Sequence, residues 1–175
     1  MYNKYPTSFD TYEEFERIFN SIPENDRLEW AENLDPKLLR MKMDNGRAVA
    51  HVLAKSGTLP EKFITEELLR MEDKDGWTVA HMLAHNRILP EKWITEDLLR
   101  TKNSYYGSTV AHELAWNGTL PEKFITDELL RMKDRAGRTV AHSLTWGGTL
   151  PEKFITEELL RMKDDSGWTV AHLLA

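Results

Sequence analysis

Five histidines occur at one position of a repeated sequence, and histidines in such a pattern could bind a metal ion or act as general acids and bases. Each follows Thr-Val-Ala, or Ala-Val-Ala in the first copy, and they are His51, His81, His112, His142 and His172. Intervals of 30, 31, 30 and 30 residues separate them, which indicates a repeat array. Stacked helices lie ~10 Å apart, whereas zinc ligands lie within ~2.1 Å of the ion. Adjacent histidines therefore cannot share a metal, and a structural role as buried hydrogen-bond donors and acceptors is favoured.

Other chemical motifs are absent from the sequence. His112-Glu113 begins like a zinc-protease helix, but Trp116 stands where the second histidine is required. His81 and His85 are four residues apart, yet the position of His85 carries lysine or tryptophan in the other copies, so His85 is interpreted as a contact residue. No cysteine, glycine-rich phosphate loop or nucleophile elbow occurs. The sequence predicts a protein that is not an enzyme, with no metal and no cofactor.

The elements that position these residues begin with a helical cap. Apolar residues at three- and four-residue spacings predict a helix over 9–20, with Thr11 and Glu14 at capping-box spacing, and a second helix over 24–33. Residues 1–33 are therefore predicted to be an N-terminal capping segment. The array follows over 34–175, with units at about 34–63, 64–93, 94–124, 125–154 and 155–175.

Each repeat is predicted to contain short helices separated by a polar loop. We expect a helical turn over Pro60 to Phe63, a break at Thr65 and a helix over 66–72. Thr58 and Glu61 have the spacing of a capping box around the first turn. After a loop that contains glycine, Thr78 is expected to cap a two-turn helix over 79–85. Helices this short are stable only when stacked.

The string Gly-x-Thr-Val-Ala-His-x-Leu-Ala-x-x-Gly, most complete over 107–118, resembles the opening helix of an ankyrin repeat, written Gly-x-Thr-Pro-Leu-His-x-Ala-Ala. The resemblance covers about 44–175, although Val-Ala replaces Pro-Leu and Leu-Pro-Glu-Lys-Phe-Ile-Thr has no ankyrin counterpart. It implies an all-α solenoid of about 4.5 helix-turn-helix repeats, in which each histidine bonds the loop to the helix start.

The function is predicted to lie where the copies differ, because variation marks positions released from packing. Three columns vary: the residue after the loop glycine, and the residues one and four positions past the histidine. In ankyrin-like stacks these columns lie at the loop tip and along the concave face. The predicted partner-binding residues are Arg47, Lys55, Trp77, Met82, His85, Glu113, Trp116, Arg138, Trp146 and Trp168.

Tryptophan and arginine often carry the binding energy of protein interfaces, so the leading hypothesis is a protein–protein interaction module. Trp77 and Trp168 have an alternative role in covering the seams between repeats. A second hypothesis comes from the charge, which is −6 overall. Residues 10–35 carry nine acids against two arginines. That segment could act as a decoy or inhibitor of phage or pathogen type, blocking a basic site on a host protein.

The overall acidity argues against direct nucleic-acid binding. No apolar run suggests a signal peptide or a membrane span, so a cytoplasmic protein is expected, with delivery into a host cell as an alternative. The last repeat would leave Val170, Leu173 and Leu174 on an uncovered end face. Either a partner or a second copy of the chain covers that face, or the native protein is longer.

Overall fold

The computed structural model describes residues 4–174, which divide into two compact units between Asn86 and Arg87. The regular secondary structure of the described residues is all helical, apart from isolated β-bridges in the loops. Unit 1 contains α1 (Tyr12–Ser21), α2 (Glu24–Ala31), η1 (Pro36–Arg40), α3 (Val49–Lys55), η2 (Glu61–Phe63), α4 (Glu66–Leu69) and α5 (Val79–His85). The predicted all-α helical repeat is confirmed.

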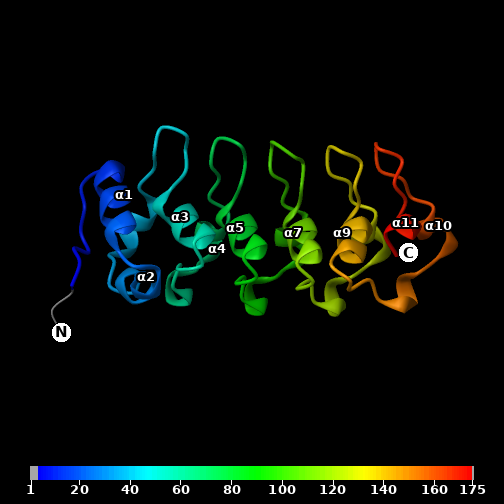
Figure 1. Cartoon of the computed structure of the whole chain (residues 1–175), viewed down its shortest axis with the longest axis horizontal. Coiled ribbons are helices and arrows are strands. Elements are labelled where there is room, and N and C mark those ends of the chain that lie inside the picture. Colours follow the sequence, from blue (N-terminus) through cyan, green and yellow to red (C-terminus); the bar gives the residue numbers. More distant parts are fainter. Residues whose placement is uncertain (1–3, 175) are drawn as a thin grey trace. The chain divides into compact units, whose positions relative to one another are not determined.

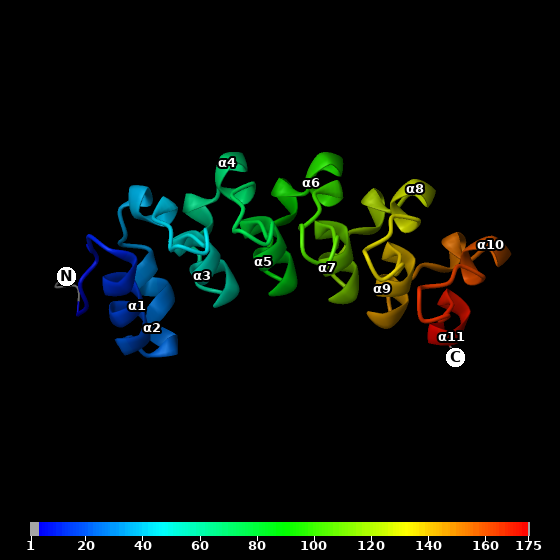
Figure 2. The same ribbon diagram turned by 90° about the horizontal axis from the view of Figure 1, so that it is seen from above.

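Unit 2 continues the same pattern of short helices. It contains η3 (Glu91–Trp93), α6 (Glu96–Arg100), α7 (Val110–Trp116), η4 (Glu122–Phe124), α8 (Asp127–Leu130), α9 (Val140–Trp146), η5 (Glu152–Phe154), α10 (Glu157–Leu160) and α11 (Val170–Leu174). Within unit 2, α7, α9 and α11 form one row and α6, α8 and α10 a second (Figure 2). The hairpin loops of the unit project from the same side of these helices (Figure 1).

The N-terminal segment packs around one phenylalanine. The Phe15 ring is fully buried and lies 5.2–6.2 Å, between ring centroids, from four other aromatic rings. The helix α1 begins later than predicted because Thr11 is its N-cap, with the Thr11 hydroxyl accepting from the Glu14 amide at 3.1 Å. The second helix ends two residues early, at Ala31.

The predicted break at Thr65 is confirmed. The Thr65 hydroxyl accepts from the Leu68 amide at 3.1 Å and caps α4. This helix ends at Leu69, earlier than predicted, because Glu72 pairs with Thr78 in an isolated antiparallel bridge that starts the hairpin.

The predicted capping box at Thr58 is wrong. No side chain caps η2, whose N-cap is Pro60. The Thr58 hydroxyl instead lies 2.7 Å from the Ser56 hydroxyl and 3.5 Å from the Leu53 carbonyl oxygen, which has no partner within α3 and also accepts the Thr58 amide. Thr119 and Thr149 make the equivalent contact with Leu114 and Leu144.

Each short helix that carries a histidine has a buried apolar face. In α7, Val110, Ala111, Leu114 and Ala115 are at most 1% exposed. The equivalent residues of α3, α5 and α9 are equally buried, except that Thr145 replaces the second alanine. Packing between repeats therefore supplies the stability that helices of seven residues lack.

Candidate functional site

The repeated histidines are structural, as predicted. The Nδ1 atom of His112 accepts the Thr109 amide hydrogen at 3.2 Å, so this neutral ring carries its proton on Nε2. Nε2 then donates to the Arg138 carbonyl of the next hairpin at 3.2 Å. His51 and His142 make the same inter-repeat bond to the carbonyls of Trp77 and Trp168. Each of these rings holds its own helix start against the following loop.

Burial favours the neutral form of these rings. Desolvation lowers the pKa of His112 from 6.5 to about 4, and the pKa of His51 is lowered for the same reason. Within residues 4–174, no three histidine or acidic side chains gather into a group that could hold a metal ion. The histidine column is therefore part of the scaffold.

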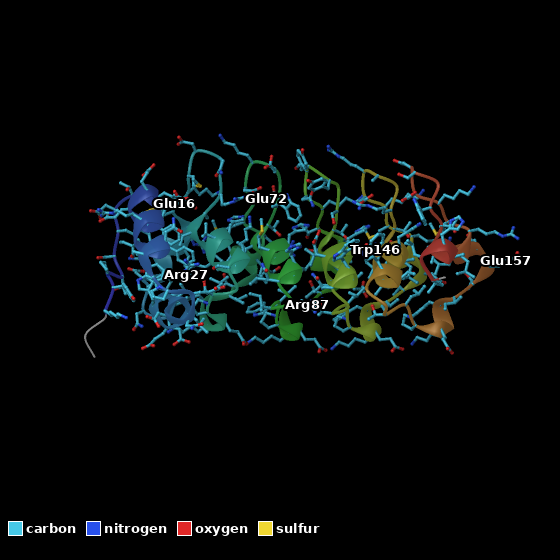
Figure 3. All side chains as sticks on the ribbon, viewed as in Figure 1. Glu16, Arg27, Glu72, Arg87, Trp146 and Glu157 are labelled. Atoms are coloured by element: carbon cyan, nitrogen blue, oxygen red, sulfur yellow. The ribbon has the colours of Figure 1, made fainter. Side chains whose placement is uncertain are left out.

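Trp116 and Trp146 form the most distinctive exposed feature of unit 2. They are the last residues of α7 and α9, and their indole rings stack with centroids 4.9 Å apart and planes inclined by 19°. The side chains remain 42% and 61% exposed, and Figure 3 labels Trp146 at α9. Two stacked indoles in contact with solvent form a large, rigid apolar surface of the kind that anchors protein interfaces.

Gly147 allows the two helix ends to meet. A Cβ atom at this position would lie 2.4 Å from the Ala115 carbonyl oxygen and 3.0 Å from that of Trp116. The equivalent position in unit 1 is Asn86, whose amide donates to the Ala54 and Lys55 carbonyls at the end of α3. A polar junction between repeats is thus replaced, at Gly147, by direct backbone contact beside the indole pair.

Two predicted contact residues, Arg47 and Arg138, are engaged in ion pairs. Arg138 Nη2 lies 2.8 Å from the buried carboxylate of Asp134 in its own hairpin. Arg47 Nη2 lies 3.5 Å from Asp73 in the following hairpin. These arginines hold the loops, although the Arg138 side chain is still 48% exposed.

The remaining predicted residues divide by burial. Met82 is only 8% exposed and belongs to the packed interior, so it presents little surface to a partner. Glu113 is half-buried and accepts a hydrogen bond from the Ser108 hydroxyl, and Trp77 is half-buried with its ring edge against His81. Lys55, His85 and Trp168 are exposed.

A second exposed aromatic pair, missed from the sequence, lies in the hairpin of unit 2 that is one residue longer. Tyr105 and Tyr106 are 59% and 49% exposed, and their rings pack edge to face with centroids 4.5 Å apart. The extra residue in this loop is the sequence feature that could have indicated the pair. Packing of the repeats does not require the insertion, and loops that vary in this way often carry binding residues.

The end face expected to expose three apolar residues does so only partly. Val170 is fully buried, Leu173 is half-buried and Leu174 is 46% exposed. Ile155 adds to the exposed surface at 38%, whereas the equivalent Ile125 is 6% exposed.

Comparison with known proteins gives a fold but no family. No protein-family model and no curated protein matches the chain. The fold is similar to that of an immunity protein in the solved structure of the Bd0816 predatory endopeptidase from Bdellovibrio bacteriovorus in complex with immunity protein Bd3460. The TM-score is 0.54 at 15% identity, over 86% of this chain and 89% of the other. At this identity the likeness extends to the fold alone.

No helix in the described part of the chain is long and apolar enough to cross a membrane.

Proposed function

We propose that this chain is a non-enzymatic protein-binding module and that the stacked pair Trp116 and Trp146 is the centre of its binding surface. The proposal depends on the exposure of both indole side chains, 42% for Trp116 and 61% for Trp146. The same repeat position carries Lys55 and His85 in the other copies. Packing does not require an aromatic residue there, since the other repeats fold without one. Recognition of a partner supplies a reason for the pair.

The interaction surface proposed around the pair is mixed in chemistry. Trp168, Arg138 and Glu113 remain candidates for its periphery, because each has exposed or half-exposed side-chain area. Lys55 and His85 belong to unit 1 and are exposed there, so they stay separate candidate contact residues. Met82 and Trp77 have a packing role, and Arg47 contributes chiefly by holding the Asp73 loop. The ankyrin-like relationship stays part of the proposal, since it rests on the sequence string around the histidines.

The likeness to an immunity protein supports a more specific form of the proposal. That neighbour was solved in complex with an endopeptidase. By fold analogy, the partner of this chain is an enzyme that the chain inhibits by occupying its surface. The analogy favours a chain that acts through binding and performs no catalysis itself.

The proposal is tested with immobilised chain of residues 1–175 and a Trp116→Ala, Trp146→Ala variant, both exposed to extract from the source cell. We expect proteins retained by the natural chain and lost from the variant to include the partner, which is then purified and assayed for enzymatic activity with and without the chain. Trp93→Phe is the matched control, because Phe63, Phe124 and Phe154 occupy that column. Equal retention by the tryptophan pair variant would reject the assigned surface.

The acidic segment 10–35 supports a second candidate function, that of a decoy for a basic site. Seven of its nine acids are exposed, namely Asp10, Glu13, Glu16, Glu24, Glu29, Glu32 and Asp35. A partner held by this surface would bind with a steep dependence on ionic strength. An affinity that does not change between low and high salt would count against the decoy and in favour of the indole pair.

Self-association through the last repeat is a further part of the proposal. Ile155 and Leu174 expose apolar area that a second copy would cover. Sedimentation equilibrium should then show a concentration-dependent mass that Ile155→Glu reduces to that of the monomer. If the natural chain stays monomeric at all accessible concentrations, self-association through the last repeat is rejected.

A further inference from the structure

The hairpins of the third and fourth repeats carry exposed tyrosines and an arginine in their turns and an exposed lysine at each base. The Arg135 amide donates to the Tyr106 carbonyl at 2.8 Å, and the Arg135 guanidinium donates to the Tyr105 carbonyl at 3.3 Å. The Lys102 ammonium donates to the Lys133 carbonyl at 3.1 Å. These contacts hold the two hairpins side by side. We call the surface formed by Lys102, Tyr105, Tyr106, Lys133 and Arg135 the hairpin patch.

Gly107 fixes this arrangement. Its φ angle is +65°, and a Cβ atom there would lie 3.0 Å from Arg135 Cγ and 3.2 Å from the Arg135 backbone nitrogen. A side chain at this position would therefore separate the hairpins. The extra loop residue thus presents the tyrosines without loss of the contact to the next repeat.

The hairpin patch is positively charged in a chain that is acidic overall. Residues 102–107 and 133–138 contain four cations and one acid, a net charge of +3. The one acid, Asp134, has a side chain only 3% exposed, and its carboxylate is neutralised by Arg138. Lys102, Lys133 and Arg135 therefore face solvent with no exposed carboxylate in their own hairpins.

We propose that the hairpin patch is a second contact region that binds an acidic segment of a protein partner, with the tyrosines covering apolar side chains beside the carboxylates. This inference rests on the proposed protein-binding function and extends it to a specific chemistry. Tyrosine supplies rigid contact area at low entropic cost, and exposed cations steer and orient an acidic partner. Nucleic acid is the less favoured ligand, because three exposed cations are few for tracking a phosphate backbone and the chain carries a net charge of −6.

Fluorescence anisotropy with a labelled oligoglutamate peptide tests the proposal. The natural chain should bind the peptide at low salt, and Lys133→Ala with Arg135→Ala should weaken binding about tenfold, as expected for the loss of two exposed ion pairs. Lys163→Ala is the control for Lys133→Ala, because Lys163 has the same repeat position in a hairpin that carries Asp165 and Ser166 near its tip. That control should change binding little.

A second probe tests the tyrosines and the class of ligand. Leucines placed between the glutamates should strengthen binding to the natural chain, and Tyr105→Ala with Tyr106→Ala should remove that gain while leaving oligoglutamate binding in place. An oligothymidylate of equal charge should bind more weakly than oligoglutamate. The proposal is overturned by absence of peptide binding, by equal loss in Lys163→Ala, by retention of the leucine gain in the tyrosine variant, or by tighter binding of the oligothymidylate.

The binding surface at the indole pair and the hairpin patch can be tested independently of each other. The Trp116→Ala, Trp146→Ala variant should bind oligoglutamate as the natural chain does, since its hairpins are unchanged. Loss of peptide binding in that variant would contradict an independent hairpin patch, whereas loss of partner binding alone would support the indole pair.

Discussion

The Cα atom of Gly147 faces the Ala115 carbonyl so closely that a Cβ atom would lie 2.4 Å from its oxygen. This contact joins the ends of α7 and α9 and places the Trp116 and Trp146 rings 4.9 Å apart. The candidate site therefore depends on the close backbone contact between α7 and α9 as well as on the two tryptophan side chains.

Gly147→Ala should separate these helix ends. We expect a loss of about 1–3 kcal/mol in the free energy of unfolding, as for other overpacked sites, and a weaker exciton signal from the indoles in circular dichroism. Chemical denaturation and far-ultraviolet circular dichroism spectra provide the measurement. Ser56→Ala, at the same repeat position in unit 1, should cost less. An unchanged exciton signal in Gly147→Ala would show that the backbone contact does not set the ring geometry.

The first repeat lacks the threonine cap that the other repeats have. Ala48 provides no side-chain cap for α3, whereas the Thr78 hydroxyl accepts the His81 amide at 3.2 Å. Ala48→Thr should raise the free energy of unfolding by about 1 kcal/mol, and Thr78→Ala should lower it by at least that amount. Urea titrations of both variants test the pair. A destabilised Ala48→Thr would mean that the buried site has no room for the added atoms.

The neutral histidines make stability depend on pH. In the folded chain the pKa of His112 is about 4, whereas the free side chain has a pKa of 6.5. Below pH 6.5 this histidine therefore binds a proton in the unfolded chain but stays neutral in the folded chain. The free energy of unfolding therefore has its full value above pH 6.5 and decreases as the pH is lowered. For this one group the loss is roughly 2 kcal/mol at about pH 5. His51 contributes in the same direction.

Thermal unfolding between neutral and mildly acidic pH tests this dependence. His112→Asn should be less stable at neutral pH, because it loses the bonds to Thr109 and Arg138, and its stability should fall less on acidification. His85→Asn, at an exposed position, is the control. An equal pH dependence in the natural chain and in His112→Asn would contradict the assignment.

Local chemistry made much of the repeat predictable from sequence. The break at Thr65 and the helix from Val79 to His85 follow from capping within three residues, and both were predicted. Thr58 was misassigned because its hydroxyl contacts the Ser56 hydroxyl and the Leu53 carbonyl, at the end of the preceding helix. A capping pattern does not reveal that competing acceptor.

The site was predictable only as a set of columns. Variation among copies identified Trp116 and Trp146, but it gave no means of separating them from Met82, which occupies a variable column and is buried. Gly147 acts on a residue 32 positions earlier, and Arg135 acts on the tyrosines of the previous hairpin. Such contacts depend on how successive repeats stack, which spacing alone does not specify.

The affinity of the purified partner for the Trp116→Ala, Trp146→Ala variant tests the central claim most directly. Calorimetric titration should show binding weaker by at least ~2 kcal/mol, about 30-fold in Kd, with helicity and unfolding midpoint close to those of the natural chain. Trp93→Phe should bind as the natural chain does. Undiminished affinity in the double variant, or its unfolding, would contradict the claim that the indole pair is a binding surface.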